Sequence, residues 1–73
     1  MVTRGRMHLA KGDIAEAIRW FDQALAWNET LGEAHYFKAL AYLNANPPDR
    51  EKAAASARLA RAHGYPEADK LPV

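Results

Sequence analysis

Apolar residues recur at every third or fourth position along four stretches of the chain, which is the spacing of one face of an α-helix. The clearest stretch covers residues 12–25 and reads GDIAEAIRWFDQAL. Turn-forming residues, mainly glycine, proline, asparagine and aspartate, separate the stretches. The pattern predicts an all-α fold that ends in a tail, with helices over residues 2–11, 13–27, 31–45 and 48–63.

Residues that cap helices stand at the expected boundaries. Two starts have the capping-box spacing, with an acceptor side chain followed three positions later by glutamate: Asp13/Glu16 and Thr30/Glu33. Asn46 before Pro47 suits a third start, because a proline at the first helical position has no amide to leave unbonded. Gly12 and Gly64 suit the left-handed residue that ends many helices, so we expect caps there.

The first half of the chain corresponds to the second half when the sequence is slid along itself. A shift of 34 residues places Gly5 on Ala39, and a shift of 36 places Phe21 on Ala57. The difference fits an insertion at the Pro47-Pro48 turn. Small residues thus recur where paired helices have to approach closely, and the sequence predicts a helical hairpin in two copies.

These residues give the chain a resemblance to the tetratricopeptide repeat family, whose unit of about 34 residues forms two antiparallel helices. Residues 12–25 are similar to the family's second helix, and residues 33–43, EAHYFKALAYL, to its first. His35 replaces the usual tryptophan and Glu29 the usual proline, while the insertion and the alanine-rich last helix also resemble Sel1-like repeats. The resemblance implies one domain of two stacked antiparallel hairpins: repeat one about 1–29, repeat two about 30–64 and a capping tail 65–73.

In the resembled family, the first helices of the repeats line a concave groove that receives a peptide or a helix. This implies a non-catalytic adaptor or scaffold with a protein or peptide partner. The matching apolar stripe and its polar rim consist of Arg6, Leu9, Glu33, Tyr36, Leu40, Leu43 and Asn44. An adjacent repeat, the tail or a second copy would cover the same stripe equally well. The alternative function is therefore a structural homo-oligomerisation unit, such as a homodimer, whose groove is filled by a second copy.

Large apolar side chains mark the expected core and its cover. Phe21 lies on the apolar face of its helix and is expected in the core, whereas Trp20 and Trp27 flank this face and are expected to be half-buried. Repeat arrays need a capping segment at their ends. We therefore expect the tail, GYPEADKLPV, to fold back over the last hairpin with Tyr65 and Leu71 as its covering side chains.

Composition narrows the range of partners. Ten Lys and Arg stand against nine Asp and Glu, which gives a formal net charge of +1. So small a charge offers no electrostatic footprint for nucleic acid or an anionic membrane, and we expect neither as a partner. A nucleic-acid-binding helical repeat is the weaker alternative, favoured by the basic residues of the last helix: Arg50, Lys52, Arg58 and Arg61. With no cysteine, no signal-like run and no membrane span in the sequence, we expect a cytoplasmic protein.

The side chains that could take part in catalysis or metal binding are scattered along the sequence. His8, His35 and His63 fall on three different predicted helices, so they do not converge as metal ligands. The acidic pairs stand at helix starts, where capping explains them, and no serine or threonine has a neighbouring base. No glycine-rich phosphate loop is present. We expect no catalytic residue, no cofactor and no metal, and hence no enzyme.

Overall fold

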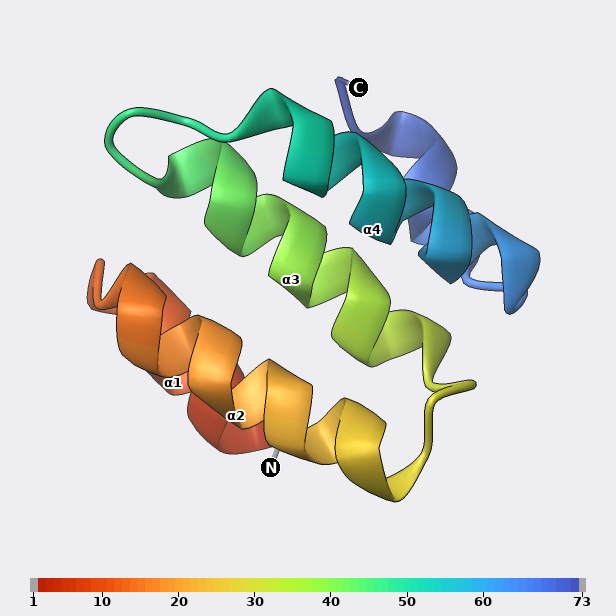
Figure 1. Cartoon of the computed structure of the whole chain (residues 1–73), viewed down its shortest axis with the longest axis horizontal. Helices are drawn as coiled ribbons and strands as arrows, with labels where there is room; N and C mark the ends of the chain where they lie inside the picture. Colours follow the sequence, from red (N-terminus) through yellow and green to blue (C-terminus); the bar gives the residue numbers. More distant parts are fainter. Residues whose placement is uncertain (1, 73) are drawn as a thin grey trace.

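The computed structural model describes residues 2–72, in which four α-helices are followed by a short 3₁₀-helix (Figure 1). The elements are α1 (Val2–Ala10), α2 (Ile14–Trp27), α3 (Gly32–Asn44), α4 (Arg50–Ala62) and η1 (Pro66–Lys70). No strand occurs in this part of the chain. The predicted all-α class is confirmed, and each predicted helix is present with its ends shifted by no more than two residues.

Each helix packs against the next one along the chain, and the most extensive contact joins α3 to α4. Figure 1 shows α3 between α2 and α4, and η1 packs against α4. A smaller contact joins α1 directly to α3. Because α3 contacts α1, α2 and α4, it is the helix with the least freedom to move without disturbing the rest of the fold.

The first core cluster fills the space between α1, α2 and α3. Its buried members are Ala17, Phe21 and Ala41, and Phe21 is the largest fully buried side chain. Gly5 makes this packing possible, since a Cβ atom at Gly5 would lie 2.5 Å from the nearest carbon of the Phe21 ring. The partly buried residues around the cluster are Val2, Leu9, Ile14, Ile18 and Phe37.

The second core cluster lies where α3 meets α4, and it includes a residue of the tail. Ala39, Ala57 and Leu71 are its buried members. Ala39 and Ala57 are the residues that correspond to Gly5 and Phe21 in the first half of the chain. Because alanine replaces phenylalanine on the fourth helix, the second cluster gains its bulk from Leu71, beyond that helix.

The helix ends agree with the sequence at the glycines and differ at the capping boxes. Gly12 and Gly64 have φ of 82° and 79°, the predicted left-handed conformation. Asp13 is the N-cap of α2, but its side chain makes no capping hydrogen bond and lies instead 3.4 Å from Nδ1 of His8. The predicted capping box of Asp13 with Glu16 is therefore wrong, because the carboxylate is directed to a histidine of the preceding helix.

The start of α3 also differs from the prediction. Its N-cap is Leu31, and no side chain caps it. The Thr30 hydroxyl donates to Oδ1 of Asn28 at 2.6 Å. Thr30 is thus engaged with the end of α2, and its expected capping box with Glu33 is wrong.

The start of α4 lies two residues later than predicted. Asp49 is the N-cap, and its side chain accepts a hydrogen bond of 3.1 Å from the Lys52 amide. The Asp49 amide donates to the Tyr42 carbonyl, which fixes the loop before the helix. The start predicted from Asn46 and Pro47 is therefore wrong, because the carboxylate of Asp49 reaches the free amides and Asn46 remains in the loop.

Candidate interaction surface

The candidate surface is the apolar stripe of α3 formed by Tyr36, Leu40 and Leu43, here called the α3 stripe. Their spacing of four and three residues places them on one side of the helix. All three are half-buried and pack against the cluster of Ala39, Ala57 and Leu71. The stripe is therefore in contact with the end of the chain rather than fully open to solvent.

The tail, defined as residues 65–72, holds this position through a few contacts. The Tyr65 amide donates to the Ala60 carbonyl at 2.9 Å, and the Tyr65 ring lies 4.9 Å from the Tyr36 ring between centroids. Ala68 is fully buried, and Leu71 is only 8% exposed. The tail thus has an aromatic anchor at its start and an aliphatic anchor near its end, and it runs beside α4 in Figure 1.

Charged groups from two helices lie near the aromatic anchor. Burial raises the pKa of the Tyr65 hydroxyl above its usual value of 10.0, and the Glu33 carboxylate raises it further. The Arg6 guanidinium acts in the opposite direction on the same pKa. The electrostatic environment of Tyr65 therefore includes one group from α1 and one from α3.

The structure distributes the seven predicted partner-binding residues over three environments. Leu9 packs in the first core cluster, and the Arg6 guanidinium is exposed over the Phe37 ring, 4.8 Å from its centroid. Asn44 is exposed, and its side-chain amide donates to the Leu40 carbonyl at 3.0 Å. The remaining residues are half-buried, three of them beside Leu71: Glu33, Tyr36, Leu40 and Leu43. The seven residues do not form one open groove, because the tail covers its centre.

The histidines have local structural partners. His35 is 8% exposed, and its Nε2–H donates to the Glu29 carbonyl at 3.0 Å, since a carbonyl oxygen can only accept. Its ring stacks on His63, with centroids 5.7 Å apart and planes at 15°. Within residues 2–72, no group of three or more His, Asp or Glu side chains is placed to hold a metal ion.

Among residues 2–72, three large apolar side chains are exposed, and the sequence did not single them out as a surface. Trp27 is 81% exposed, Met7 54% and Leu59 46%. The expected half-burial of Trp27 is wrong, because it is the last residue of α2 and lies nearly one turn beyond Ala24, the last buried residue of that helix. Trp20 is half-buried as predicted, and the Arg4 guanidinium lies 5.4 Å from its ring centroid.

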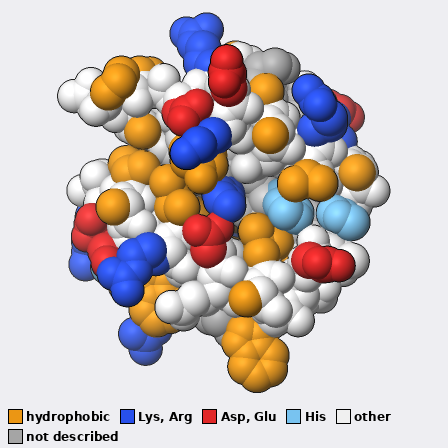
Figure 2. Space-filling model, viewed as in Figure 1, with side chains coloured by type: hydrophobic (Ala, Val, Ile, Leu, Met, Phe, Trp, Pro, Cys, Tyr) orange, Lys and Arg blue, Asp and Glu red, His pale blue; other side chains and the backbone are white. Residues whose placement is uncertain are grey.

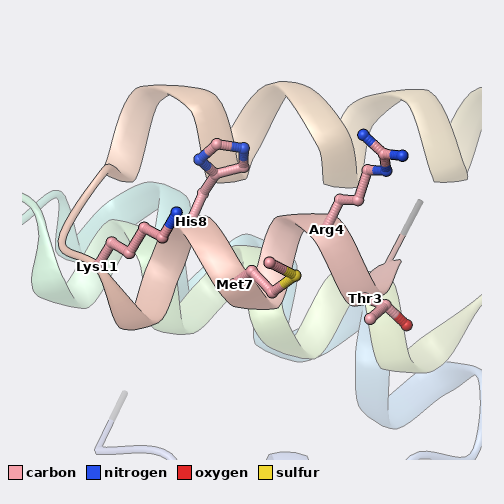
Figure 3. A pocket seen from close by; sticks show the side chains of 5 residues that line it. All are labelled: Thr3, Arg4, Met7, His8 and Lys11. Atoms are coloured by element: carbon pink, nitrogen blue, oxygen red, sulfur yellow. The ribbon is translucent and has the colours of Figure 1, made fainter.

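Met7 belongs to a shallow hollow of about 520 Å³ on the outer side of α1. Figure 3 shows its lining side chains along this helix, with His8 and Arg4 reaching toward α2. The lining residues are Thr3, Arg4, Met7, His8 and Lys11. Their spacing would have revealed a shared helix face, but the face mixes one methionine with polar residues and so gives no amphipathic signal.

The rest of the surface carries mixed charge. On the face drawn in Figure 2, basic and acidic side chains alternate with small apolar patches, and no broad region of one sign forms. Ion pairs join Lys38 to Asp22 and Arg19 to Glu16. In the part of the chain that the structure describes, no helix is long and apolar enough to cross a membrane.

No protein-family model, no curated protein and no solved structure matches the chain.

Proposed function

We propose that the chain is a non-catalytic protein–protein interaction module of two stacked helical hairpins, of the tetratricopeptide type. The contacts of α1 with α2 and of α3 with α4 support this arrangement. So does the placement of Gly5 against Phe21 and of Ala39 beside Ala57, at positions that correspond in the two halves. The tail then closes the second hairpin, as a capping segment of a short repeat array would.

The observation that carries the proposed function is that the α3 stripe already holds an apolar peptide segment. Leu71 belongs to the buried cluster against which the stripe packs, and the Tyr65 ring lies 4.9 Å from the Tyr36 ring between centroids. A helix face that accepts an aromatic and an aliphatic anchor from a short segment has the shape needed for a partner's segment of similar chemistry. Tyrosine and arginine, here Tyr36 and Arg6 at its edge, are also enriched at binding hot spots.

The groups around the stripe support binding rather than chemistry. The Glu33 carboxylate and the Arg6 guanidinium act on the pKa of Tyr65 in opposite directions. The sequence contains no cysteine that a charged neighbour could activate as a nucleophile. Glu33 and Arg6 serve instead as a polar rim that orients a partner at an apolar centre.

Homo-oligomerisation is the second candidate, and one observation favours it. Met7 is exposed in the hollow on α1, at the opposite end of the chain from the tail. A second copy would bind there without displacing the tail from the α3 stripe. The mixed charge of the face drawn in Figure 2 gives the weaker nucleic-acid alternative no support there.

The test uses the intact chain and a library of random peptides about twelve residues long. Peptides selected on the immobilised chain are titrated into the ¹⁵N-labelled chain, and amide shifts are mapped. We expect the shifts to centre on Tyr36, Leu40 and Leu43 of the α3 stripe. Shifts that centre instead on Met7 and its neighbours, or a selection that enriches nothing, would contradict the proposed surface.

A matched pair of leucines provides the control. Leu43→Ala removes a residue of the stripe, whereas Leu59→Ala removes an exposed leucine of α4. We expect Leu43→Ala to weaken peptide binding at least tenfold and Leu59→Ala to leave it unchanged. Circular dichroism establishes that both variants remain helical, and light scattering on the unmodified chain reports the oligomeric state that the second candidate requires.

A further inference from the structure

We propose that the tail is a built-in occupant of the α3 stripe, and that the partner segment it imitates carries an aromatic residue followed six positions later by leucine. This inference rests on the proposed function of the stripe as a peptide-binding surface. The tail supplies the pattern, because Tyr65 and Leu71 are its two anchors and are six positions apart. A partner binds by replacing the tail.

The aromatic anchor lies in a place that the fold leaves free. Gly32 is buried at the start of α3, and a Cβ atom there would lie 3.0 Å from the Tyr65 Cβ. The same Cβ would be 3.3 Å from the carbonyl oxygens of Ala60 and His63. Glycine costs helix stability relative to alanine, so its use here fits a requirement for space between α3, the end of α4 and an aromatic residue.

The aliphatic anchor fills a position that α4 leaves underpacked. In the first hairpin the Phe21 ring packs directly on Gly5. In the second hairpin the corresponding residues are Ala57 and Ala39, and Leu71 joins them in one buried cluster. This contact therefore takes its bulk from a segment outside the helix pair, and the leucine of a partner would supply the same bulk.

The middle of the tail, η1, packs on α4 with Ala68 buried, but its charged side chains make few contacts with that helix. Its residues between the anchors are exposed apart from Ala68, and one of its ion pairs, Glu67 with Lys70, is internal to the tail. The contact of Asp69 with Arg61 is long, at 4.0 Å. Gly64 precedes the tail with φ of 79°, so the tail leaves α4 through a residue of high conformational freedom. The tail is thus attached through Tyr65, Leu71 and the buried Ala68, with a long ion pair to α4, and we expect that a competing segment can replace it.

Covalent attachment gives the tail an advantage over any free segment. A short tether produces an effective concentration on the order of millimolar, against which a partner has to compete. Weakening an anchor of the tail removes this competition. A free peptide with the same two anchors then binds the vacated stripe more tightly.

The experiment measures the binding of a fluorescein-labelled synthetic peptide, GYPEADKLPV, to three forms of the full chain by fluorescence anisotropy. The forms are the unmodified chain, Leu71→Ser, which weakens an anchor, and Lys70→Ser, which changes an exposed neighbour. We expect Leu71→Ser to bind the peptide at least tenfold more tightly than the unmodified chain, and Lys70→Ser to match the unmodified chain. A second peptide, in which serine replaces the leucine, should bind none of the three.

Equal peptide affinity for Leu71→Ser and the unmodified chain would overturn the inference, and so would equal binding of the two peptides. If Leu71→Ser is partly unfolded, its melting temperature becomes the readout: the leucine peptide should raise it and the serine peptide should not. Absence of that difference also overturns the inference. If peptides selected from the random library still map to the α3 stripe while GYPEADKLPV does not bind, the inference fails and the proposed function stands. If neither binds there, both fail.

Discussion

Gly5 is the residue whose replacement should disturb the core most sharply. A Cβ atom there would come within 2.5–2.9 Å of three carbons of the buried Phe21 ring. We expect Gly5→Val to destabilise the chain by about 1–3 kcal/mol through overpacking. Thermal denaturation followed by circular dichroism checks this, with a fall of about 4–8 °C in melting temperature for each kcal/mol.

Thr3→Val is the control for this prediction. Thr3 is exposed on the same helix, and the change introduces the same side chain without a contact to Phe21. Its melting temperature should stay close to that of the unmodified chain. A Gly5→Val variant that is as stable as Thr3→Val would show that the first hairpin does not depend on this close approach.

Tyr65 should make stability depend on alkaline pH. Its pKa is raised in the folded chain, chiefly by burial and then by Glu33, so folding favours the neutral phenol. This contribution is fully present below about pH 10, the pKa of the unfolded residue, and is lost as the pH rises through the folded pKa. We therefore expect the free energy of unfolding to decrease less above pH 10 for Tyr65→Phe than for the unmodified chain.

Urea denaturation of both chains at several pH values measures the difference. The two curves should run parallel from pH 7 to pH 9. Parallel curves above pH 10 as well would show that Tyr65 is not buried against its neighbours.

The helices illustrate which local features decide an element's boundaries. At α4 the deciding residue is Asp49, whose side chain accepts from the Lys52 amide. We expect Asp49→Ala to cost about 0.5–2 kcal/mol, the usual range for the loss of a helix cap. Glu51→Ala removes the same charge from the same first turn, but no capping hydrogen bond. Denaturation should show that the stability of Glu51→Ala lies within about 0.5 kcal/mol of that of the unmodified chain. If Asp49→Ala and Glu51→Ala are equally destabilised, Asp49 acts through its charge and not through the capping hydrogen bond.

The sequence predicted the helices well because periodic apolar faces and turn residues are local signals. Gly12 and Gly64 were predicted for the same reason, since a left-handed cap needs a residue without a side chain. The predicted capping boxes were wrong because the capping side chains interact with residues outside the helix that they precede. Asp13 lies toward His8, and Thr30 bonds to Asn28. The partner of Asp13 depends on where the preceding helix lies, which a local spacing rule does not contain, whereas Thr30 bonds to a residue only two positions away.

The candidate site was predicted less completely than the helices. The spacing of Tyr36, Leu40 and Leu43 correctly placed them on one side of a helix, since all three pack on the same cluster. Whether that side is open depends on the path of the chain after Gly64. The sequence predicted that the tail folds back with Tyr65 and Leu71 as its covering side chains, and Tyr65 lies against Tyr36 while Leu71 is buried. It did not decide whether the tail, an adjacent repeat or a second copy covers the stripe, because the cover depends on contacts between residues far apart in sequence.

At the scale of the whole molecule, α3 links the two core clusters. Ala41 and Phe37 contribute to the first cluster, and Ala39 contributes to the second. A short helical array is stable only through the contacts between neighbouring units. Because α3 contributes residues to both core clusters, the two halves of the chain should unfold together rather than one after the other.

Leu71→Ala tests this coupling from the far end of the chain. The variant removes the bulk from the second cluster, and we expect a loss of about 2 kcal/mol or more, as for other buried leucines. Both tryptophans lie on α2, so their fluorescence reports the first half of the chain. In Leu71→Ala we expect the midpoints of the tryptophan fluorescence transition and of the far-ultraviolet dichroism transition to be lowered by the same amount. The two midpoints should therefore still coincide, as in two-state unfolding. If the tryptophan midpoint stays at its original value while dichroism shows an earlier loss of helix, the halves are independent, and the tail stabilises only the hairpin that it covers.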